Sequence, residues 1–248
     1  MIIRKREEKI KLLGILLFML VTPAFFAAAS EETDIFNFKG GTLKITFCGH
    51  GTLMLDWKDF IIHVDPVQKE ADYTSLLKAD LILITHEHGD HLDPAAISMI
   101  KKQGTVIIAN ESSAKQLSGA EVLKNWEQRT VAGIKIEAIP AYNTTEGRDL
   151  FHPKGRDNGY ILSFGTEKVY IAGDTEDIPE MKSLKDITIA FLPMNQPYTM
   201  TPEQVAEAAR AFRPKVLYPY HYSDTDPERL KVLLKNELDI EVRIREMR

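Results

Sequence analysis

Three histidines and one aspartate lie within six consecutive positions, directly after a short apolar run. Residues 85–91 read THEHGDH and follow LILI at positions 81–84. Imidazole nitrogens and carboxylate oxygens are common ligands of zinc and related divalent ions. In an extended segment alternate side chains share a face, so His86, His88 and Asp90 can converge while His91 points elsewhere. The spacing predicts a metal-binding strand end that can serve two ions, His86 and His88 binding one and Asp90 and His91 a neighbour.

Two other interpretations of this segment are weaker. A polar loop can be rich in histidine by chance, but the chain has only 7 His in 248 residues, and three of them fall within six positions. The helix-borne zinc-protease pattern His-Glu-x-x-His also fails, because position 90 is Asp and the segment follows a strand-like run.

The segment resembles the His-x-His-x-Asp-His signature of the metallo-β-lactamase superfamily. In that superfamily the later ligands are a His or its equivalent, an Asp that bridges two metals, and a final His. Here one strand-like run ends in Gly173-Asp174-Thr175, and another, residues 216–221, ends in His221. Alone, Asp174 would be an ordinary turn carboxylate and His221 a surface histidine. Their order from about Leu43 to His221 instead implies that Asp174 is the bridging ligand and His221 the last one.

The remaining ligand departs from the commonest pattern. Many relatives have Pro-Ala-x-His where this chain has Pro140-Ala141-Tyr142-Asn143. An amide oxygen binds zinc less well than imidazole does. The resemblance is closest to a branch of uncharacterised hydrolases in which Ala-Tyr-Asn is followed by Phe-His-Pro-Lys, and that histidine is His152 here. We therefore assign His152 as the third ligand, with an anion-binding loop histidine as the alternative.

Two further histidines lie upstream. His50 occupies a strand-turn-strand segment that faces the active site in the related ascorbate-phosphate lactonase-like branch, so we expect it to support a ligand or contact substrate. His63 shares a strand face with Ile61 and Asp65 and is expected to be buried and hydrogen-bonded. Asp65, at the strand end, is placed to accept the second ring N–H of a ligand histidine.

Polar residues near the assigned ligands are candidates for substrate contact. Tyr198 and Tyr220 could stabilise an oxyanion or a leaving group, and aromatic packing at the rim is the alternative. Lys154 and Arg156 follow His152 and could hold an acidic group of the substrate, or they could be solvated loop charges.

The first 29 residues have the pattern of a signal peptide. A basic start precedes the apolar run 12–21, and Ala27-Ala28-Ala29 precedes Ser30. The pattern predicts cleavage before Ser30, export to the periplasm or the exterior, and no membrane attachment afterwards. An uncleaved membrane anchor is the alternative, because residues 12–29 are mostly apolar and at the lower limit of spanning length.

Residues 30–248 are expected to form one acidic domain. The leader removes 5 of 31 basic and 2 of 36 acidic residues, which leaves 26 against 34 and a net charge of −8. This balance argues against a nucleic-acid surface. The resemblance implies a small-molecule substrate. Cys48 is the only cysteine, so an internal disulfide cannot form.

The rest of the domain alternates strand and helix signals. Asp93 followed by Pro94 predicts a helix start, and so does Asp226 followed by Pro227. Thr201-Pro202-Glu203-Gln204 is a capping box that predicts a helix over 203–212. The resemblance implies an α/β fold, a four-layer α/β/β/α sandwich. Strands are predicted at 43–48, 52–57, 60–65, 81–85, 105–109, 134–139, 159–164, 168–172, 187–192, 215–219 and 240–245.

The ligand set implies an exported metal-dependent hydrolase. The resemblance implies two divalent metal ions, zinc first with manganese or iron as alternatives, held with Asp90 and Asp174 as the catalytic carboxylates. A hydroxide bridging the two metals would attack an ester, lactone or phosphodiester-type bond. One alternative is a mononuclear iron dioxygenase of the same fold, and another is a non-catalytic metal-binding protein of the cell envelope. Fold-level analogy does not choose the substrate.

Overall fold

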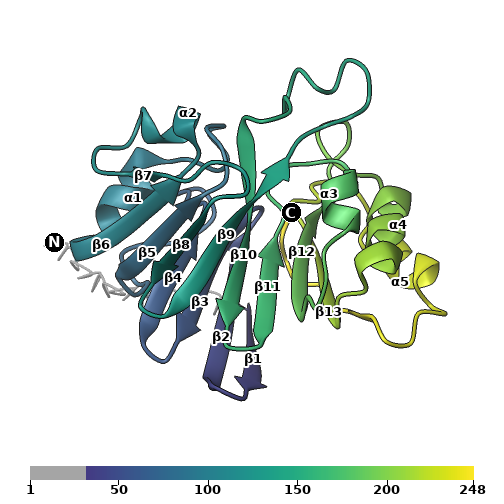
Figure 1. Cartoon of the computed structure of the whole chain (residues 1–248), viewed down its shortest axis with the longest axis horizontal. Helices are drawn as coiled ribbons and strands as arrows, with labels where there is room; N and C mark the ends of the chain where they lie inside the picture. Colours follow the sequence, from purple (N-terminus) through teal and green to yellow (C-terminus); the bar gives the residue numbers. More distant parts are fainter. Residues whose placement is uncertain (1–31) are drawn as a thin grey trace, which may run out of the picture. The chain divides into compact units, whose positions relative to one another are not determined.

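Two seven-stranded β-sheets form most of the computed structural model, which describes residues 32–248 (Figure 1). The predicted leader, residues 1–29, lies outside the described residues. The first sheet has the order β1 to β7, with strands Glu32–Phe38, Gly41–Gly49, Thr52–Trp57, Phe60–Val64, Ala79–Ile84, Lys101–Ala109 and Glu121–Val122. The second has the order β14 to β8, and β8 to β14 are Gln128–Val131, Ile134–Ala141, Asp157–Phe164, Glu167–Ile171, Ile189–Pro193, Val216–Tyr220 and Glu241–Val242.

The directions of the strands place the predicted ligand segments at one end of the strands in each sheet. In the first sheet β2, β3 and β4 pair antiparallel, and β4 pairs parallel with β5. In the second sheet β9, β10 and β11 pair antiparallel, whereas β11, β12 and β13 are parallel. The carboxyl ends of β2 and β5 therefore lie at the same end of the first sheet's strands. Those of β9, β11 and β13 likewise lie at the same end of the second sheet's strands. Loops at such strand ends commonly carry catalytic and binding residues.

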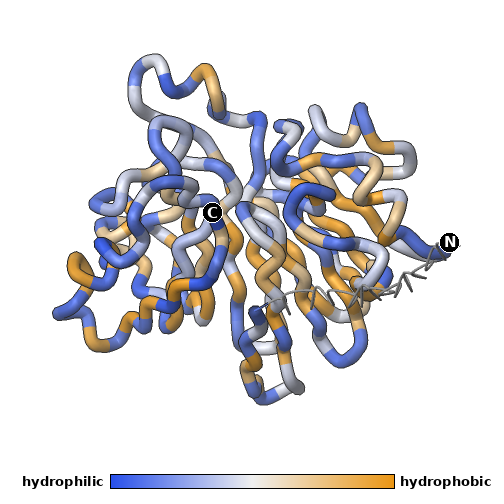
Figure 2. Tube along the Cα trace, turned by 180° about the vertical axis from the view of Figure 1, so that it is seen from behind, coloured by the Kyte–Doolittle hydropathy of each residue, from blue (hydrophilic) through white to orange (hydrophobic). Residues whose placement is uncertain are grey.

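Strand β5 shows how the layers form. Side chains alternate across a strand, so Leu81 and Leu83 face the core between the two sheets, whereas Ile82 and Ile84 pack with helix α1 (Pro94–Ile100). All four side chains are buried, as expected of a parallel strand covered on both faces. In Figure 2 hydrophobic residues are concentrated along the segments that form the strands.

The second sheet is covered in the same way on its outer face. Helices α3 (Pro179–Lys182), α4 (Pro202–Phe212) and α5 (Glu228–Leu233) lie beside β12 and β13 (Figure 1). The buried side chains of α4 join the core cluster that contains β12 and β13. The predicted four-layer α/β/β/α sandwich is therefore confirmed.

The starts of α1 and α4 follow the predicted capping residues, whereas α5 has Pro227 rather than Asp226 at its N-cap and no side-chain cap there. The Asp93 side chain accepts hydrogen bonds from the backbone of Ala95 and Ala96 at the start of α1. At α4, Thr201 accepts from the backbone of Gln204, and the Gln204 side chain accepts from the backbone of Thr201, so both halves of the capping box are present. The short helix α2 (Glu111–Ala114) was not predicted. No helix among residues 32–248 combines the length and apolar character needed to cross a membrane.

The two ends of the described chain differ from the prediction. Strand β1 was not predicted; it pairs antiparallel with β2 along its whole length. The predicted strand 240–245 is wrong in extent, because only Glu241–Val242 pairs with β13. The residues that follow turn toward β1, where the Arg245 guanidinium donates to Asp34 at 2.7 and 2.8 Å.

Candidate metal centre

The loops that follow these strand ends bring together all seven residues that the sequence assigned as ligands. His86, His88, Asp90 and His91 follow β5, and His152 lies in the loop between β9 and β10. Asp174 follows β11 and His221 follows β13. Two main-chain hydrogen bonds connect the sheets here: the backbone amide of Asn158 donates to Thr85 O at 3.0 Å, and that of His221 donates to His50 O at 3.1 Å.

Most of the ligand atoms fall into two neighbouring groups, and a third group of His86, His91 and Asp174 overlaps both. The first group comprises His86, His88 and His152, and the second comprises His50, Asp90, His91 and His221; within each group the atoms lie within 4.8 Å of one another. His86 Nε2 is 3.1 Å from His88 Nδ1 in the first group. His221 Nε2 is 3.7 Å from Asp90 Oδ2 in the second.

Asp174 lies between the two groups. Its Oδ2 is 3.5 Å from His152 Nε2 and 3.3 Å from His221 Nε2, and its Oδ1 is 3.4 Å from His91 Nε2. Two ligands bound tetrahedrally to one ion at about 2.0 Å lie roughly 3.3 Å apart. These separations therefore suit atoms that share a metal ion.

Several buried atoms at this point have no hydrogen-bond partner among the described residues. They include His91 Nε2, His221 Nε2 and Asp174 Oδ1. Buried polar atoms are normally paired, because an unpaired one costs its full desolvation penalty. Divalent ions would satisfy all three atoms, so the residues present fit a metal centre.

Buried carboxylates hold the far ring nitrogens of two histidines. His91 Nδ1 donates to Asp65 Oδ2 at 2.9 Å, and His152 Nδ1 donates to Asp157 Oδ2 at 3.0 Å. Such contacts fix the tautomer of a ligating histidine and leave Nε2 free to bind the metal. The sequence indicated this role for Asp65 but missed Asp157, although a carboxylate opening β10 five residues after His152 was a usable signal.

The electrostatics of the cluster favour positive charge. Burial alone would lower the pKa of His91, but the carboxylates of Asp174 and Asp65 raise it to about 9. Burial likewise opposes the charged form of Asp90, yet the neighbouring imidazoles of His221, His50 and His91 leave its pKa lowered. A group of carboxylates that stabilises a protonated imidazole also attracts a divalent cation.

The two upstream histidines behave differently. His50 contacts the cluster, with Nε2 3.2 Å from Asp90 Oδ2. His63 is fully buried elsewhere, and its Nε2 lies 2.9 Å from Leu77 O. Burial lowers the pKa of His63 to about 4. The prediction of a buried, hydrogen-bonded His63 is confirmed.

Asn143 serves the loop rather than the ligand groups. Its side-chain amide donates to Tyr198 O at 2.7 Å and to Arg148 O at 3.1 Å. Its backbone amide donates to His152 O at 2.9 Å. His152 lies with His86 and His88 in the first group. The side-chain NH2 of Asn143 connects the His152 loop to Tyr198, and its Oδ1 is buried without a hydrogen-bond partner among the described residues.

The buried carboxylate of Glu176 anchors the start of the same loop. It accepts from the backbone of Thr144 and Thr145, each at 2.7 Å, and Arg148 donates to its other oxygen at 3.2 Å. Glu176 is not among the residues that the sequence pattern indicated.

Two glycines allow the backbone to approach the site closely. A Cβ at Gly51 would lie 2.8 Å from Cε1 of His91. A Cβ at Gly173 would lie 2.6 Å from the backbone oxygen of Asn158, and Gly173 also has a φ of +66°. Glycine is therefore required beside His91 and directly before Asp174.

The ligand groups open into a cleft of about 340 Å³. The rings of Phe151 and Tyr198 meet edge to face at its wall, 4.9 Å apart. No lysine or arginine lines this cleft within residues 32–248; its lining residues are His88, Asp90, Phe151, His152, Asp174, Asn195, Tyr198 and His221. Asn195 was not singled out from the sequence, where nothing distinguished it from an ordinary loop amide.

Three other predicted substrate contacts do not line the cleft. Tyr220 is fully buried, as the aromatic-packing alternative expected. The Lys154 amine lies 3.1 Å from the Tyr142 hydroxyl and 3.5 Å from Glu180 Oε1. Arg156 pairs with Asp157 and with Glu87, which orders it within the loop. These charges are engaged by the protein itself.

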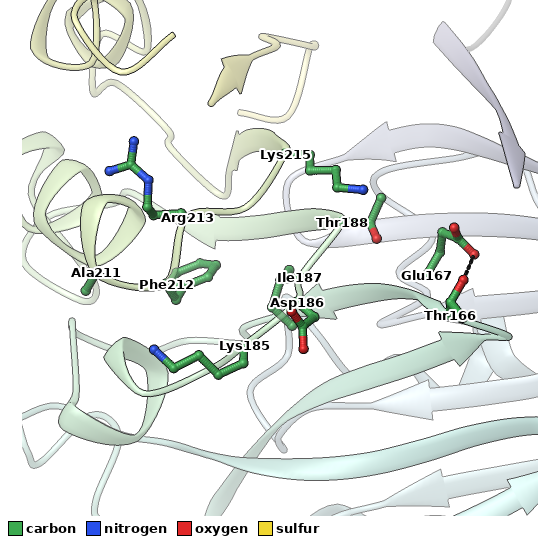
Figure 3. Close-up of a pocket in the computed structure, with 10 residues that line it drawn as sticks. All are labelled: Thr166, Glu167, Lys185, Asp186, Ile187, Thr188, Ala211, Phe212, Arg213 and Lys215. Carbon is green, nitrogen blue, oxygen red and sulfur yellow. Dashed lines mark hydrogen bonds between the residues drawn. The ribbon is translucent and has the colours of Figure 1, made fainter. Parts of the chain in front are cut away.

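A larger cleft of about 480 Å³ lies at the opposite ends of the parallel strands (Figure 3). Thr166 and Glu167 are hydrogen-bonded at its wall, and Lys185 and Lys215 precede β12 and β13. None of its lining residues is a histidine or a cysteine. The volume of a cleft therefore does not identify the metal site, because candidate metal ligands line the smaller cleft.

Comparisons with known proteins agree with this site. The model of the β-lactamase superfamily domain matches residues 44–221, well over half of the chain. A UPF0173 metal-dependent hydrolase of Thermococcus kodakarensis is 30% identical over 216 residues, covering 80% of this chain and 95% of that protein.

Solved structures give the same result. A protein from Parabacteroides distasonis described as a metal-dependent hydrolase is 61% identical with a TM-score of 0.86, over 88% of this chain and 100% of that one. The metallo hydrolase Igni18 of Ignicoccus hospitalis is 25% identical with a TM-score of 0.68, over 82% of this chain and 95% of that one. The chain therefore belongs to the metallo-β-lactamase superfamily, as one of its metal-dependent hydrolases.

Proposed function

We propose that this chain is an exported hydrolase with two divalent metal sites, which cleaves an ester or lactone bond in a small uncharged substrate. His86, His88 and His152 form the first site, and Asp90, His91 and His221 form the second. The position of Asp174 carries the proposal, because its two oxygens lie 3.3 to 3.5 Å from nitrogens of both groups. A carboxylate in that position can bridge two ions. Zinc suits the mixture of imidazole and carboxylate ligands best.

The chain's own residues organise the chemistry. When bound, divalent ions at such a site activate water and polarise the substrate oxygen that gains charge. Asp174 sets the separation of the two sites, and Asp65 and Asp157 orient His91 and His152. No side-chain nucleophile is required. Tyr198, which is exposed, and Asn195 line the cleft, and their side chains carry groups that can donate to substrate oxygens.

The lining of the cleft favours an uncharged substrate over a phosphodiester. Phosphate recognition commonly uses arginine or lysine, and neither lines the cleft among the described residues. The faces of Phe151 and Tyr198 instead offer apolar contact. A volume of about 340 Å³ is at the small end of ligand pockets, which fits a compact ester or lactone.

Export is proposed from the signal-peptide pattern before Ser30. The intact mass of protein isolated from the periplasm or the medium should correspond to a chain that begins within a few residues of Ser30. A soluble cytoplasmic protein that retains the leader would contradict export.

The activity is tested with residues 30–248 purified without added metal. Elemental analysis should find two zinc equivalents per chain. A panel of neutral esters, lactones and phosphodiesters should show turnover of an ester or lactone, lost on chelation and restored by zinc. Full activity of the metal-free protein would contradict the proposal. One iron per chain would indicate the dioxygenase alternative, and bound metal with no turnover of any compound would indicate the non-catalytic one.

A further inference from the structure

His50 is fixed beside the last ligand of the second group. It lies in the turn between β2 and β3 with a φ of 48°, and its backbone oxygen accepts from the His221 amide at 3.1 Å. The centroids of the two imidazole rings are 3.7 Å apart. The His50 ring is largely buried, with 11% of its side chain exposed. The backbone and the ring of His50 are therefore both in contact with His221.

Each ring nitrogen of His50 faces an oxygen atom. Nδ1 is 3.0 Å from the main-chain oxygen of Arg248, and Nε2 is 3.2 Å from Asp90 Oδ2. A main-chain oxygen only accepts hydrogen bonds, so Nδ1 carries the hydrogen. In the neutral ring Nε2 then presents a lone pair to the carboxylate of Asp90. Two acceptors at this distance repel each other unless a proton or a metal ion lies between them.

The same arrangement occurs at the assigned ligands. His91 and His152 each donate Nδ1–H to a protein oxygen, and each directs Nε2 toward Asp174. His63 differs, because its Nε2 contacts the backbone oxygen of Leu77 instead. The 3.2 Å between His50 Nε2 and Asp90 Oδ2 also matches the roughly 3.3 Å expected between two tetrahedral ligands of one ion. His50 is thus oriented as a ligand.

The end of the chain holds the Arg248 oxygen in place. Met247 is fully buried; its amide donates to the Tyr222 hydroxyl at 3.2 Å, and its oxygen accepts from the Tyr222 amide at 3.3 Å. Two residues earlier, the Arg245 guanidinium binds Asp34 on β1. By contrast, 73% of the Arg248 side chain is exposed. The backbone at residue 248 is therefore positioned, whereas its side chain is not engaged in the site.

We propose that His50 is a ligand of the second metal site, and that the main-chain oxygen of Arg248 holds its ring in the ligating orientation. The inference rests on the proposed function only in requiring that the second site binds a metal. It adds a fourth protein residue to Asp90, His91 and His221, besides the bridging Asp174. It also makes the affinity of that site depend on a residue 198 positions away in the sequence.

Nitrogen ligands can be counted directly in the unmodified protein. ¹⁵N-histidine-labelled protein is loaded with ¹¹³Cd²⁺, and one-bond coupling between ¹¹³Cd and ¹⁵N identifies each ligating ring. Of the 7 histidines in the chain, six should show coupling, and His63 alone should not. Any set of coupled histidines that lacks His50 overturns the proposal. No substrate is involved, so the result is independent of whether an ester or lactone is cleaved.

Zinc titration of the metal-free variants tests the same point. In His50→Ala the first equivalent should bind as in the unmodified protein, whereas the second should weaken by at least about 100-fold, because loss of a ligand should cost no less than loss of its outer partner. Circular dichroism checks that the variant is folded. Second-site affinity within threefold of the unmodified protein would overturn the ligand assignment.

The Arg248 oxygen is tested with a matched pair. A chain that ends at Met247 loses this oxygen, whereas Arg248→Ala keeps it and changes only the exposed side chain. The shortened chain should bind the second zinc about 10 to 100 times more weakly, and Arg248→Ala should bind it normally. Equal second-site affinity in both, or equal weakening in both, would overturn the role of the main-chain oxygen.

Discussion

His91 and Asp65 form a completely buried hydrogen bond across 26 positions of the sequence, with 2.9 Å between Nδ1 and Oδ2. The carboxylate also accepts from the backbone and the hydroxyl of Thr85, the residue that opens the metal-binding motif. One buried carboxylate therefore fixes both the start of the motif and the ring of its last histidine. This contact directs His91 Nε2 toward Asp174.

Asp65→Asn should weaken the second metal site. An asparagine has a single acceptor oxygen, so at least one of the three donors around residue 65 is left unpaired, at a cost of about 1 to 3 kcal/mol. Affinity for the second zinc should fall by about 10 to 100-fold, while the first site changes little. Zinc titration and urea unfolding measure the two effects. Asp59→Asn, at an exposed carboxylate, is the control; an equal loss in both variants would contradict the assigned role of Asp65.

Replacing His152 should empty the first site. His152 belongs to the group with His86 and His88, whereas the Asn143 side-chain NH2 donates to two backbone oxygens of the loop. His152→Ala should lose about one metal equivalent per chain and most of the activity, and Asn143→Ala should keep both metals. Elemental analysis gives the count. Full metal content in His152→Ala would show that another residue, not His152, is the ligand of the first site.

Asp174 should be the most sensitive single carboxylate of the site. It is 3% exposed and lies between both groups, so Asp174→Ala removes the bridge. Turnover should fall by at least about 100-fold, since even outer partners of metal ligands are worth 10 to 100-fold. Tyr198→Phe, at the rim of the cleft, should lose much less. Near-normal hydrolysis by Asp174→Ala would show that no bridging carboxylate is needed.

The sequence predicted the parts of this molecule that depend on local pattern. Helix starts followed from Asp93 and Thr201, because capping residues lie within three positions of the groups they bind. Strand β5 followed from four consecutive apolar residues. Strand β1 was missed because residues 32–38 are half polar and become a strand only through pairing with β2.

The candidate site likewise has some residues that local sequence pattern reveals and others that it does not. The motif at 86–91 is visible because its members are adjacent in the sequence. The supports of the ligands are not adjacent. Glu176 anchors a loop about 30 residues earlier in the sequence, and Arg248 approaches His50 from the other end of the domain. Such pairs are set by how the two sheets pack, which a single sequence does not display.

Asp34 should make stability depend on pH. Burial raises its pKa, but hydrogen bonds from Tyr218 and Arg245 outweigh burial, so the pKa is lowered. A lowered pKa in the folded state stabilises the protein above the unfolded value of about 3.9, and this stabilisation is lost as the pH falls through the folded-state pKa. Asp34→Asn should therefore cost about 1 to 3 kcal/mol at pH 7, and the difference from the unmodified protein should shrink below about pH 4. Urea unfolding of both proteins at each pH measures it; a difference that grows on acidification would contradict this.

Gly51 and Gly89 provide a matched steric test of the second site. Gly51→Ala places a Cβ 2.8 Å from Cε1 of His91, closer than atoms normally approach, so the ring must shift away from Asp174 or the β2–β3 turn must move. Gly89→Ala, inside the motif itself, adds a Cβ that meets nothing within 4 Å. The first variant should bind the second zinc at least about 10-fold more weakly, comparable to loss of an outer partner, and should lose activity in proportion. The second should match the unmodified protein in zinc titration and hydrolysis. If both alanines behave alike, close packing of Gly51 against His91 does not control the geometry of the site.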